Sequence, residues 1–170
     1  GPRLYKQIKS KKLKSFISTG VGTKYRIHFL AAKIADEKLK KINSMNKNTL
    51  MEQLGIECIE LGDDYVISRM PVDQRTHQPM GLLHGGASAA LIESIGSMGS
   101  TLLLDITKQH PVGIEINANH VGGIRSGYVI AKGKIVHAGK KTHLWQVDIT
   151  EEKTDKLVCS GRLTVMIIDI

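Results

Sequence analysis

The sequence GASAALIESIGSMGSTLLL, residues 86–104, decides the fold of this chain. It is apolar or small throughout apart from Glu93, and we expect it to form one long helix. Each of its three glycines costs an isolated helix about 1 kcal/mol relative to alanine. That cost is tolerable when strands pack closely against the glycines, so the sequence predicts a buried helix wrapped by a sheet.

Strand-like patterns lie on both sides of this helix. Before it we expect a short helix, with Thr49 and Glu52 as a capping box and Gly55 as its end, and then strands at 56–61 and 65–70. After it come four long strand-like runs separated by turns, at residues 112–121, 127–137, 141–150 and 157–168. Short connections favour antiparallel neighbours, so these four runs predict a meander. The expected fold class is α+β: a long central helix wrapped by a curved antiparallel sheet of about six strands.

The net charge of +8 is concentrated in a leader. Residues 1–42 hold twelve basic and two acidic residues, so the remainder is slightly acidic, and we expect no nucleic-acid partner. We divide the chain into a basic leader or non-native extension, 1–44, and a domain, 45–170. A loose amphipathic helix is expected over 28–42. The leader has three open interpretations: vector-derived or upstream translated sequence, a basic surface arm, or a targeting segment.

Composition restricts the class of protein. The chain has 170 residues, 41% of them hydrophobic and 24% charged, as in a soluble domain with a real core. Its apolar runs are too short to span a bilayer, so we expect a cytoplasmic protein with no membrane partner. Cys58 and Cys159 are expected to be reduced thiols, and no Cys/His cluster has zinc spacing, so we expect no metal.

Glu93 is the residue that most needs an explanation. It is the one carboxylate between Asp73 and Asp105, and it lies in an apolar helix. Burying a carboxylate without partners is costly, so it should be hydrogen-bonded or functional. Ser97 and Ala89, one turn away on either side, make its face small and polar, which leaves room for a substrate. The alternative is an exposed glutamate on a polar stripe.

His84-Gly85-Gly86 lies where the preceding loop enters the helix. The first N–H groups of a helix have no intrahelical acceptors and carry a positive partial charge. Glycine lets a carbonyl approach that backbone closely, so this turn can polarise a thioester oxygen. Gln78 precedes His84 by six residues and Glu93 follows it by nine, and this spacing makes the motif specific.

These residues lie within three longer stretches: MPVDQRTHQPMGLLHGGASAALIESIGS, VGIEINANHVGGIRSG and GKKTHLWQVDITEEKTDKLVCSGRLTV. The chain resembles, over roughly residues 45–168, the hotdog-fold thioesterases of the phenylacetic-acid-degradation type. It is most similar to the branch of dihydroxynaphthoyl-CoA thioesterase and the enterobactin-proofreading thioesterase. The resemblance implies hydrolysis of an aromatic or medium-chain acyl-CoA to the free acid and CoA.

The resemblance also implies residue roles. Glu93 acts as general base or as nucleophile, and the Gly85 N–H binds the thioester oxygen. Gln78 orients the thioester, His84 lies near its sulfur and carbonyl, and Ser97 helps to hold water. The residues expected to contact substrate are His120, Met98, Ser94, Arg125, Lys140, Lys141 and His143, the last four near the CoA phosphates. In this family a basic residue usually follows the Asn-His-Val segment, where this chain has Gly122-Gly123, so phosphate contacts should differ.

The same resemblance implies a homo-oligomer, a dimer of dimers, in which Glu93 serves the carbonyl held by the other subunit. No cofactor is expected, since a base, a water and an oxyanion site suffice, and an acyl carrier protein remains open as the substrate carrier. Two alternatives stay open. A non-catalytic acyl-CoA-binding sensor would bind without releasing thiol, and a hotdog hydratase or dehydratase would carry a His-Phe-Pro-Gly type motif, which is absent.

Overall fold

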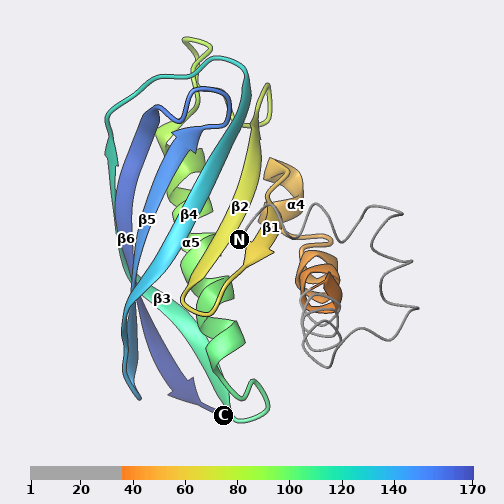
Figure 1. Cartoon of the computed structure of the whole chain (residues 1–170), viewed down its shortest axis with the longest axis vertical. Coiled ribbons are helices and arrows are strands. Elements are labelled where there is room, and N and C mark those ends of the chain that lie inside the picture. The colour runs from red at the N-terminus through yellow and green to blue at the C-terminus, as the bar shows by residue number, and fades with distance from the viewer. Residues whose placement is uncertain (1–35) are drawn as a thin grey trace, which may run out of the picture. The chain divides into compact units, whose positions relative to one another are not determined.

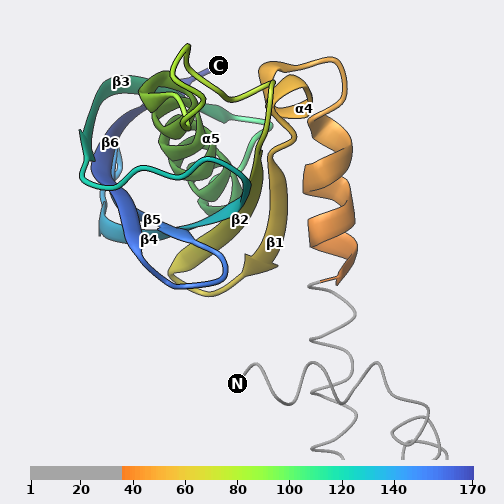
Figure 2. The same ribbon diagram turned by 90° about the horizontal axis from the view of Figure 1, so that it is seen from above.

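One long helix packs against the inner face of a curved six-stranded sheet in the computed structural model, which describes residues 36–170 (Figure 1). Seen from above, the sheet curls around the helix (Figure 2). The elements are the helices α4 (Leu50–Leu54) and α5 (Gly85–Leu103) and the strands β1 (Glu57–Leu61), β2 (Tyr65–Val72), β3 (Gln109–His120), β4 (Gly127–Ala138), β5 (Thr142–Glu151) and β6 (Leu157–Asp169). The expected α+β hotdog arrangement is therefore confirmed.

The glycines of α5 allow the close packing that the sequence predicts. A Cβ at Gly99 would overlap the indole of Trp145 on β5, and one at Gly96 would overlap Leu163 on β6. The sheet approaches in the same way, since a Cβ at Gly161 would lie 2.7 Å from Ile92 Cδ1. Side chains of α5 such as Ile92 are fully buried. Helix and sheet thus approach more closely than alanine at these positions would permit.

The predicted meander is wrong for β3. The strand order is β1-β2-β4-β5-β6-β3, so β3 pairs with β6 at the far edge and not with β4. The connection to β4 is short but crosses the open end of the sheet. Its Val121 N–H and Gly122 N–H both donate to Val158 O of β6, and Ile124 O accepts from Leu83 N–H. Backbone partners on both sides hold the crossing, which a pattern of strands and turns does not reveal.

Several local predictions need smaller corrections. Thr49 is the N-cap of α4, but its hydroxyl donates to Asn46 O, and the Glu52 carboxylate accepts from Asn48 N–H, so the capping box does not form. Gly55 ends α4 in the left-handed region, as expected. The predicted helix over 28–42 lies partly outside the described residues, and 36–45 are helical.

The two edges of the sheet differ. At β1, the Asn43 side-chain amide donates to Cys58 O and accepts from Cys58 N–H, both at 2.9 Å, as a neighbouring strand would. With Ile42 buried as well, the packing of the domain begins ahead of residue 45. At β3, by contrast, Ile114 and Ile116 are 53% and 39% exposed. The β3 edge is therefore the one available for pairing with another strand.

Candidate active site

The first turn of α5 presents an unused backbone donor. His84 is the N-cap, and its Nδ1 accepts from Gly86 N–H at 2.8 Å. The N–H groups of Ala87 and Ser88 both donate to His84 O. Gly85 N–H has no acceptor within residues 36–170, so the cap satisfies the amides around it and leaves this one free. The donor predicted at Gly85 is thus available, and the dipole of α5 strengthens it.

His120 lies directly against this donor. It is the last residue of β3, and a Cβ at Gly85 would stand 2.8 Å from His120 Nε2. His120 pairs with the buried Cys159 on the inner face of the sheet, while Asn119 pairs with Ser160. Glycine at 85 therefore makes room for an imidazole beside the donor.

Gln78 belongs to the loop that leads into α5. His84 N–H donates to Thr76 O and Gln78 N–H donates to Leu82 O, so the loop folds back on itself. Gln78 follows Thr76 by two residues and therefore lies close to the start of α5. The Gln78 side-chain oxygen accepts from Met80 N–H. This bond orients the amide and leaves its NH₂ group as a donor. The structure thus gathers Gln78, His84, Gly85 and His120 at the end of the domain where α5 begins.

Glu93 lies elsewhere, in the middle of α5. Its carboxylate is half-buried and accepts from Ser97 Oγ at 3.3 Å, the pairing expected one turn along the helix. It rests on β3 at Gly113, where a Cβ would overlap Oε1 and stand 2.9 Å from Oε2. Eight residues of helix, about 12 Å along the axis, separate Glu93 from Gly85. One chain therefore carries two half-sites and does not bring its own carboxylate to its own donor.

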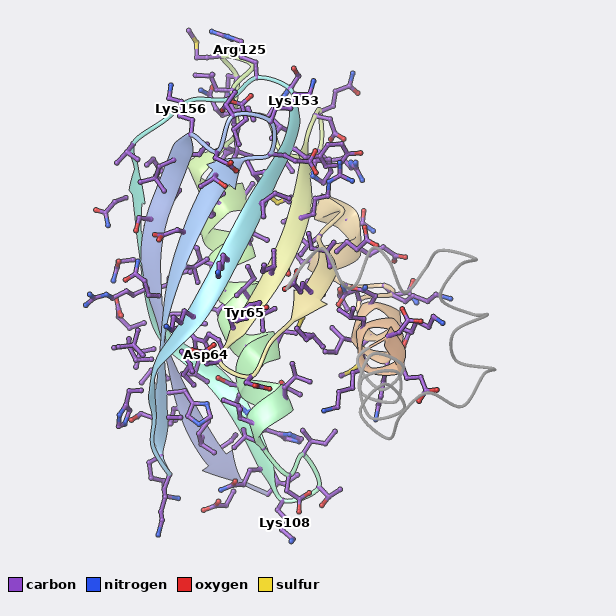
Figure 3. All side chains as sticks on the ribbon, viewed as in Figure 1. Asp64, Tyr65, Lys108, Arg125, Lys153 and Lys156 are labelled. Carbon is purple, nitrogen blue, oxygen red and sulfur yellow. The ribbon has the colours of Figure 1, made fainter. Side chains whose placement is uncertain are left out.

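The predicted phosphate-binding residues fall into two groups. Arg125 lies at the end of the domain where α5 begins, and Figure 3 shows Lys153 and Lys156 at the same end. The Arg125 guanidinium donates to Met80 O at 2.9 Å. Lys140, Lys141 and His143 instead line a cavity of about 540 Å³ beside the C-terminal end of α5.

The second group is not uniformly accessible. Lys141 Nζ is paired with Asp169 at 2.8 Å, whereas Lys140 has no ion-pair partner among the described residues. His143 is 4% exposed and faces α5, with Nδ1 3.0 Å from Ser100 Oγ. The same hydroxyl oxygen accepts from Trp145 Nε1. Burial, and secondly the nearby His137, lower the pKa of His143, which favours a neutral ring. Of this group Lys140 is the most available cation.

Two further predicted contact residues, Met98 and Ser94, lie on α5. Met98 is 9% exposed, at the margin of the core, and the Ser94 hydroxyl donates to Ala90 O at 2.7 Å. Both are close in sequence to Glu93, but the hydroxyl that donates to the Glu93 carboxylate is that of Ser97. Within the described part of the chain, no group of three or more His, Cys, Asp or Glu residues could hold a metal. No helix there is long and apolar enough to cross a membrane.

Sequence reasoning missed Gly113, which lies in a run of strand-forming residues. An isolated glycine inside a strand signals a bulge or a close approach of other atoms, and here it marks both. That signal was readable from the sequence. The contact of Gly113 with Glu93 was not readable from the sequence, because it depends on how β3 packs against α5.

Comparisons with known proteins agree with this architecture. Residues 80–158 match the thioesterase superfamily. The 1,4-dihydroxy-2-naphthoyl-CoA hydrolase of Escherichia coli is 45% identical over 130 residues, which cover 76% of this chain and 94% of the relative. A crystal structure of a glutamine-to-alanine variant of a Pseudomonas aeruginosa thioesterase is 42% identical, with a TM-score of 0.76 over 78% of this chain and 94% of that one.

A thioesterase of Staphylococcus aureus is similar as well. Two crystal structures of its variants are 41% and 42% identical to this chain, with TM-scores of 0.69 and 0.67. They cover 71% and 69% of this chain and 99% and 97% of theirs. One variant replaces a glutamate by alanine and the other replaces a glutamine fifteen positions earlier. By sequence, fold and the extent of these matches, this chain belongs to the thioesterase superfamily, and the resemblance noted from its sequence is confirmed.

Proposed function

We propose that the protein hydrolyses an aromatic or medium-chain acyl-CoA to the free acid and CoA at a site shared by two copies. The observation that carries the proposal is the separation of the half-sites. A free N–H at Gly85 and a half-buried carboxylate at Glu93 are each built on α5, about 12 Å apart along its axis. Each lacks, within the described part of its own chain, the group that it needs.

An antiparallel pairing of two β3 strands supplies the missing group. A two-fold axis between Ile116 and Asn117 would set Gly113 of one copy opposite His120 of the other. Because Glu93 rests on Gly113 and Gly85 rests on His120, this register brings the carboxylate of one copy toward the donor of the other. The exposed apolar residues of β3 and its edge position support such a seam.

The proposed chemistry follows from these groups. Gly85 N–H donates to the thioester oxygen and stabilises the negative charge that develops there. Glu93 of the second copy takes a proton from water as the water oxygen attacks the carbonyl carbon, or attacks that carbon itself to form an anhydride that water then opens. The C–S bond breaks and CoA leaves as the thiolate, which takes up a proton. Ser97 holds the carboxylate or the water, and Gln78 donates to the thioester.

The glutamine and glutamate replaced in the Staphylococcus aureus thioesterase support two of these roles. They are fifteen positions apart, which is also the spacing between Gln78 and Glu93. In this chain one residue lies before α5 and the other in its middle, on different half-sites. The spacing therefore favours Gln78 and Glu93 as the residues with equivalent positions.

The antiparallel pair also explains how the divided basic residues can serve one ligand. In this pair, the end of one copy that holds the start of α5 lies beside the end of the other copy that holds the last turn of α5. Arg125 of one copy and Lys140 of the other then flank the same site, and both are suited to CoA phosphates. The Escherichia coli relative is named for an aromatic acyl-CoA, which favours an aromatic acid here. From the family resemblance we also propose a dimer of dimers in the cytoplasm, with acyl carrier protein as the alternative carrier.

Thiol release from benzoyl-CoA tests the proposal. Glu93→Gln should keep the fold and the oligomeric state, because an amide has the shape of the carboxylate, yet lose most of its turnover. Glu57→Gln, an exposed carboxylate on β1, is the matched control and should turn over normally. Full activity of Glu93→Gln would refute the assignment, and binding without thiol release by the unaltered protein would favour the sensor alternative.

A further inference from the structure

The Glu93 carboxylate lies against Gly113 of β3. A Cβ at Gly113 would overlap Glu93 Oε1 and lie 2.8 Å from Cδ and 2.9 Å from Oε2. All three side-chain atoms therefore occupy the space that any other residue would fill at position 113. Ser97 Oγ donates to Oε1 of the same carboxylate at 3.3 Å.

A β-bulge directs Gly113 toward the helix. The pairing of β3 with β6 shifts register between Gly113 and Glu115, so Ile114 has no partner and the alternation of β3 is reset. Gly113 and Ile116, three residues apart, can then both face α5, and His120 follows on the same face. The bulge thus sets the resting place of Glu93 and the histidine beside Gly85 on one surface of one strand.

We propose that Gly113 is a positioning residue for hydrolysis, because its missing Cβ provides the space in which the Glu93 carboxylate is held. This inference rests on the proposed role of Glu93. Without the glycine, the carboxylate must move by about 1 Å to restore ordinary van der Waals separation. A displacement of that size can reduce turnover about 100-fold without changing the chemistry available.

Gly113→Ala tests the inference through turnover of benzoyl-CoA. We expect kcat to fall about 100-fold and KM to change less than threefold, because the displaced group activates water and does not bind CoA. Val136→Thr, 60% exposed on β4, which does not pair with β3, is the control and should keep its kcat. Size-exclusion chromatography and thermal unfolding should show the same oligomer and fold in both variants.

Glu93→Asp provides the decisive second change, since aspartate retracts the carboxylate by one methylene. Alone it should lower kcat, but in the Gly113→Ala background it should restore part of the lost turnover, because the shorter side chain fits beside the new methyl group. A merely structural role of Gly113 predicts losses that add. Additive losses, a normal kcat for Gly113→Ala, or a loss explained by dissociation of the oligomer would overturn the inference. If Glu93→Gln is itself fully active, the proposed function fails first and independently.

Discussion

Gly99→Ala should destabilise the domain, although alanine is the better helix former. Gly99 is the point where α5 meets the ring of Trp145, which is 2% exposed. A Cβ there would overlap Cη2 and lie 2.5 Å from Cζ2. The ring has little room to withdraw, because its Nε1 donates to Ser100 Oγ at 2.9 Å.

The magnitude follows from two opposing contributions. Alanine stabilises a helix by about 1 kcal/mol relative to glycine. Forcing an extra carbon into a packed core costs about 1–3 kcal/mol, and displacing the indole N–H from Ser100 costs about 1 kcal/mol more. The expected net loss is therefore about 1–3 kcal/mol, and each kcal/mol lowers the Tm of a domain of this size by about 2–4 °C.

Guanidinium unfolding followed by fluorescence measures this directly, because Trp145 is the sole tryptophan of the chain. A second comparison, followed by circular dichroism, places Gly99→Ala in a Trp145→Phe background. The smaller ring should reduce the cost of the added methyl group. If Gly99→Ala is as stable as the unaltered protein or more so, close approach of the sheet is not the reason for the glycine.

Three further outcomes are expected. Asn43→Ala leaves the backbone N–H and C=O of Cys58 without the Asn43 amide and should cost about 1–2 kcal/mol in chemical unfolding. For the same reason a chain starting at residue 42, which keeps Asn43, should keep its Tm and activity, while one starting at 46, which lacks it, should not. The pKa of His143 is held below its ordinary value by burial, so unfolding lets the ring take up a proton, and stability should fall as pH decreases from about 7 to 5; His143→Gln should flatten that dependence, and an unchanged slope would contradict it. Burial raises the pKa of Cys58 to about 11 and also raises the pKa of Cys159, so neither thiol should react with Ellman's reagent at pH 8 until guanidinium is added. Thiol-release assays are then undisturbed by the protein's own cysteines.

The central helix was predictable because its composition has one physical explanation. Small residues interrupted by glycine make a poor isolated helix, so Gly96 and Gly99 had to be matched by close neighbours. The half-buried, hydrogen-bonded state of Glu93 was predictable for a similar reason, because it is a single carboxylate in an apolar segment. These inferences depend on local sequence alone. The resemblance to known thioesterases then added proposed roles for Gln78 and His84, which spacing could not supply.

Long-range pairing was not predictable in the same way. The short connection after His120 suggested that β3 and β4 are neighbours, but Val121 and Gly122 bind β6 instead. The contacts of Gly113 with Glu93 and of Asn43 with Cys58 join elements whose proximity depends on the finished fold. A strand pattern specifies which faces are buried, but it does not specify which edge meets which partner.

Mixing two inactive variants tests the shared site most directly. Glu93→Gln lacks the carboxylate, and Gly85→Pro lacks the N–H donor at a first helical position, where the backbone accepts proline but the His120 ring must move aside. If each site combines Gly85 of one copy with Glu93 of the other, a mixed dimer has one intact site. Equal mixing makes half of the dimers mixed, so co-refolding should recover about one quarter of the unaltered activity toward benzoyl-CoA. Activity no higher than that of either variant alone would show that each site lies within one chain and would contradict the account.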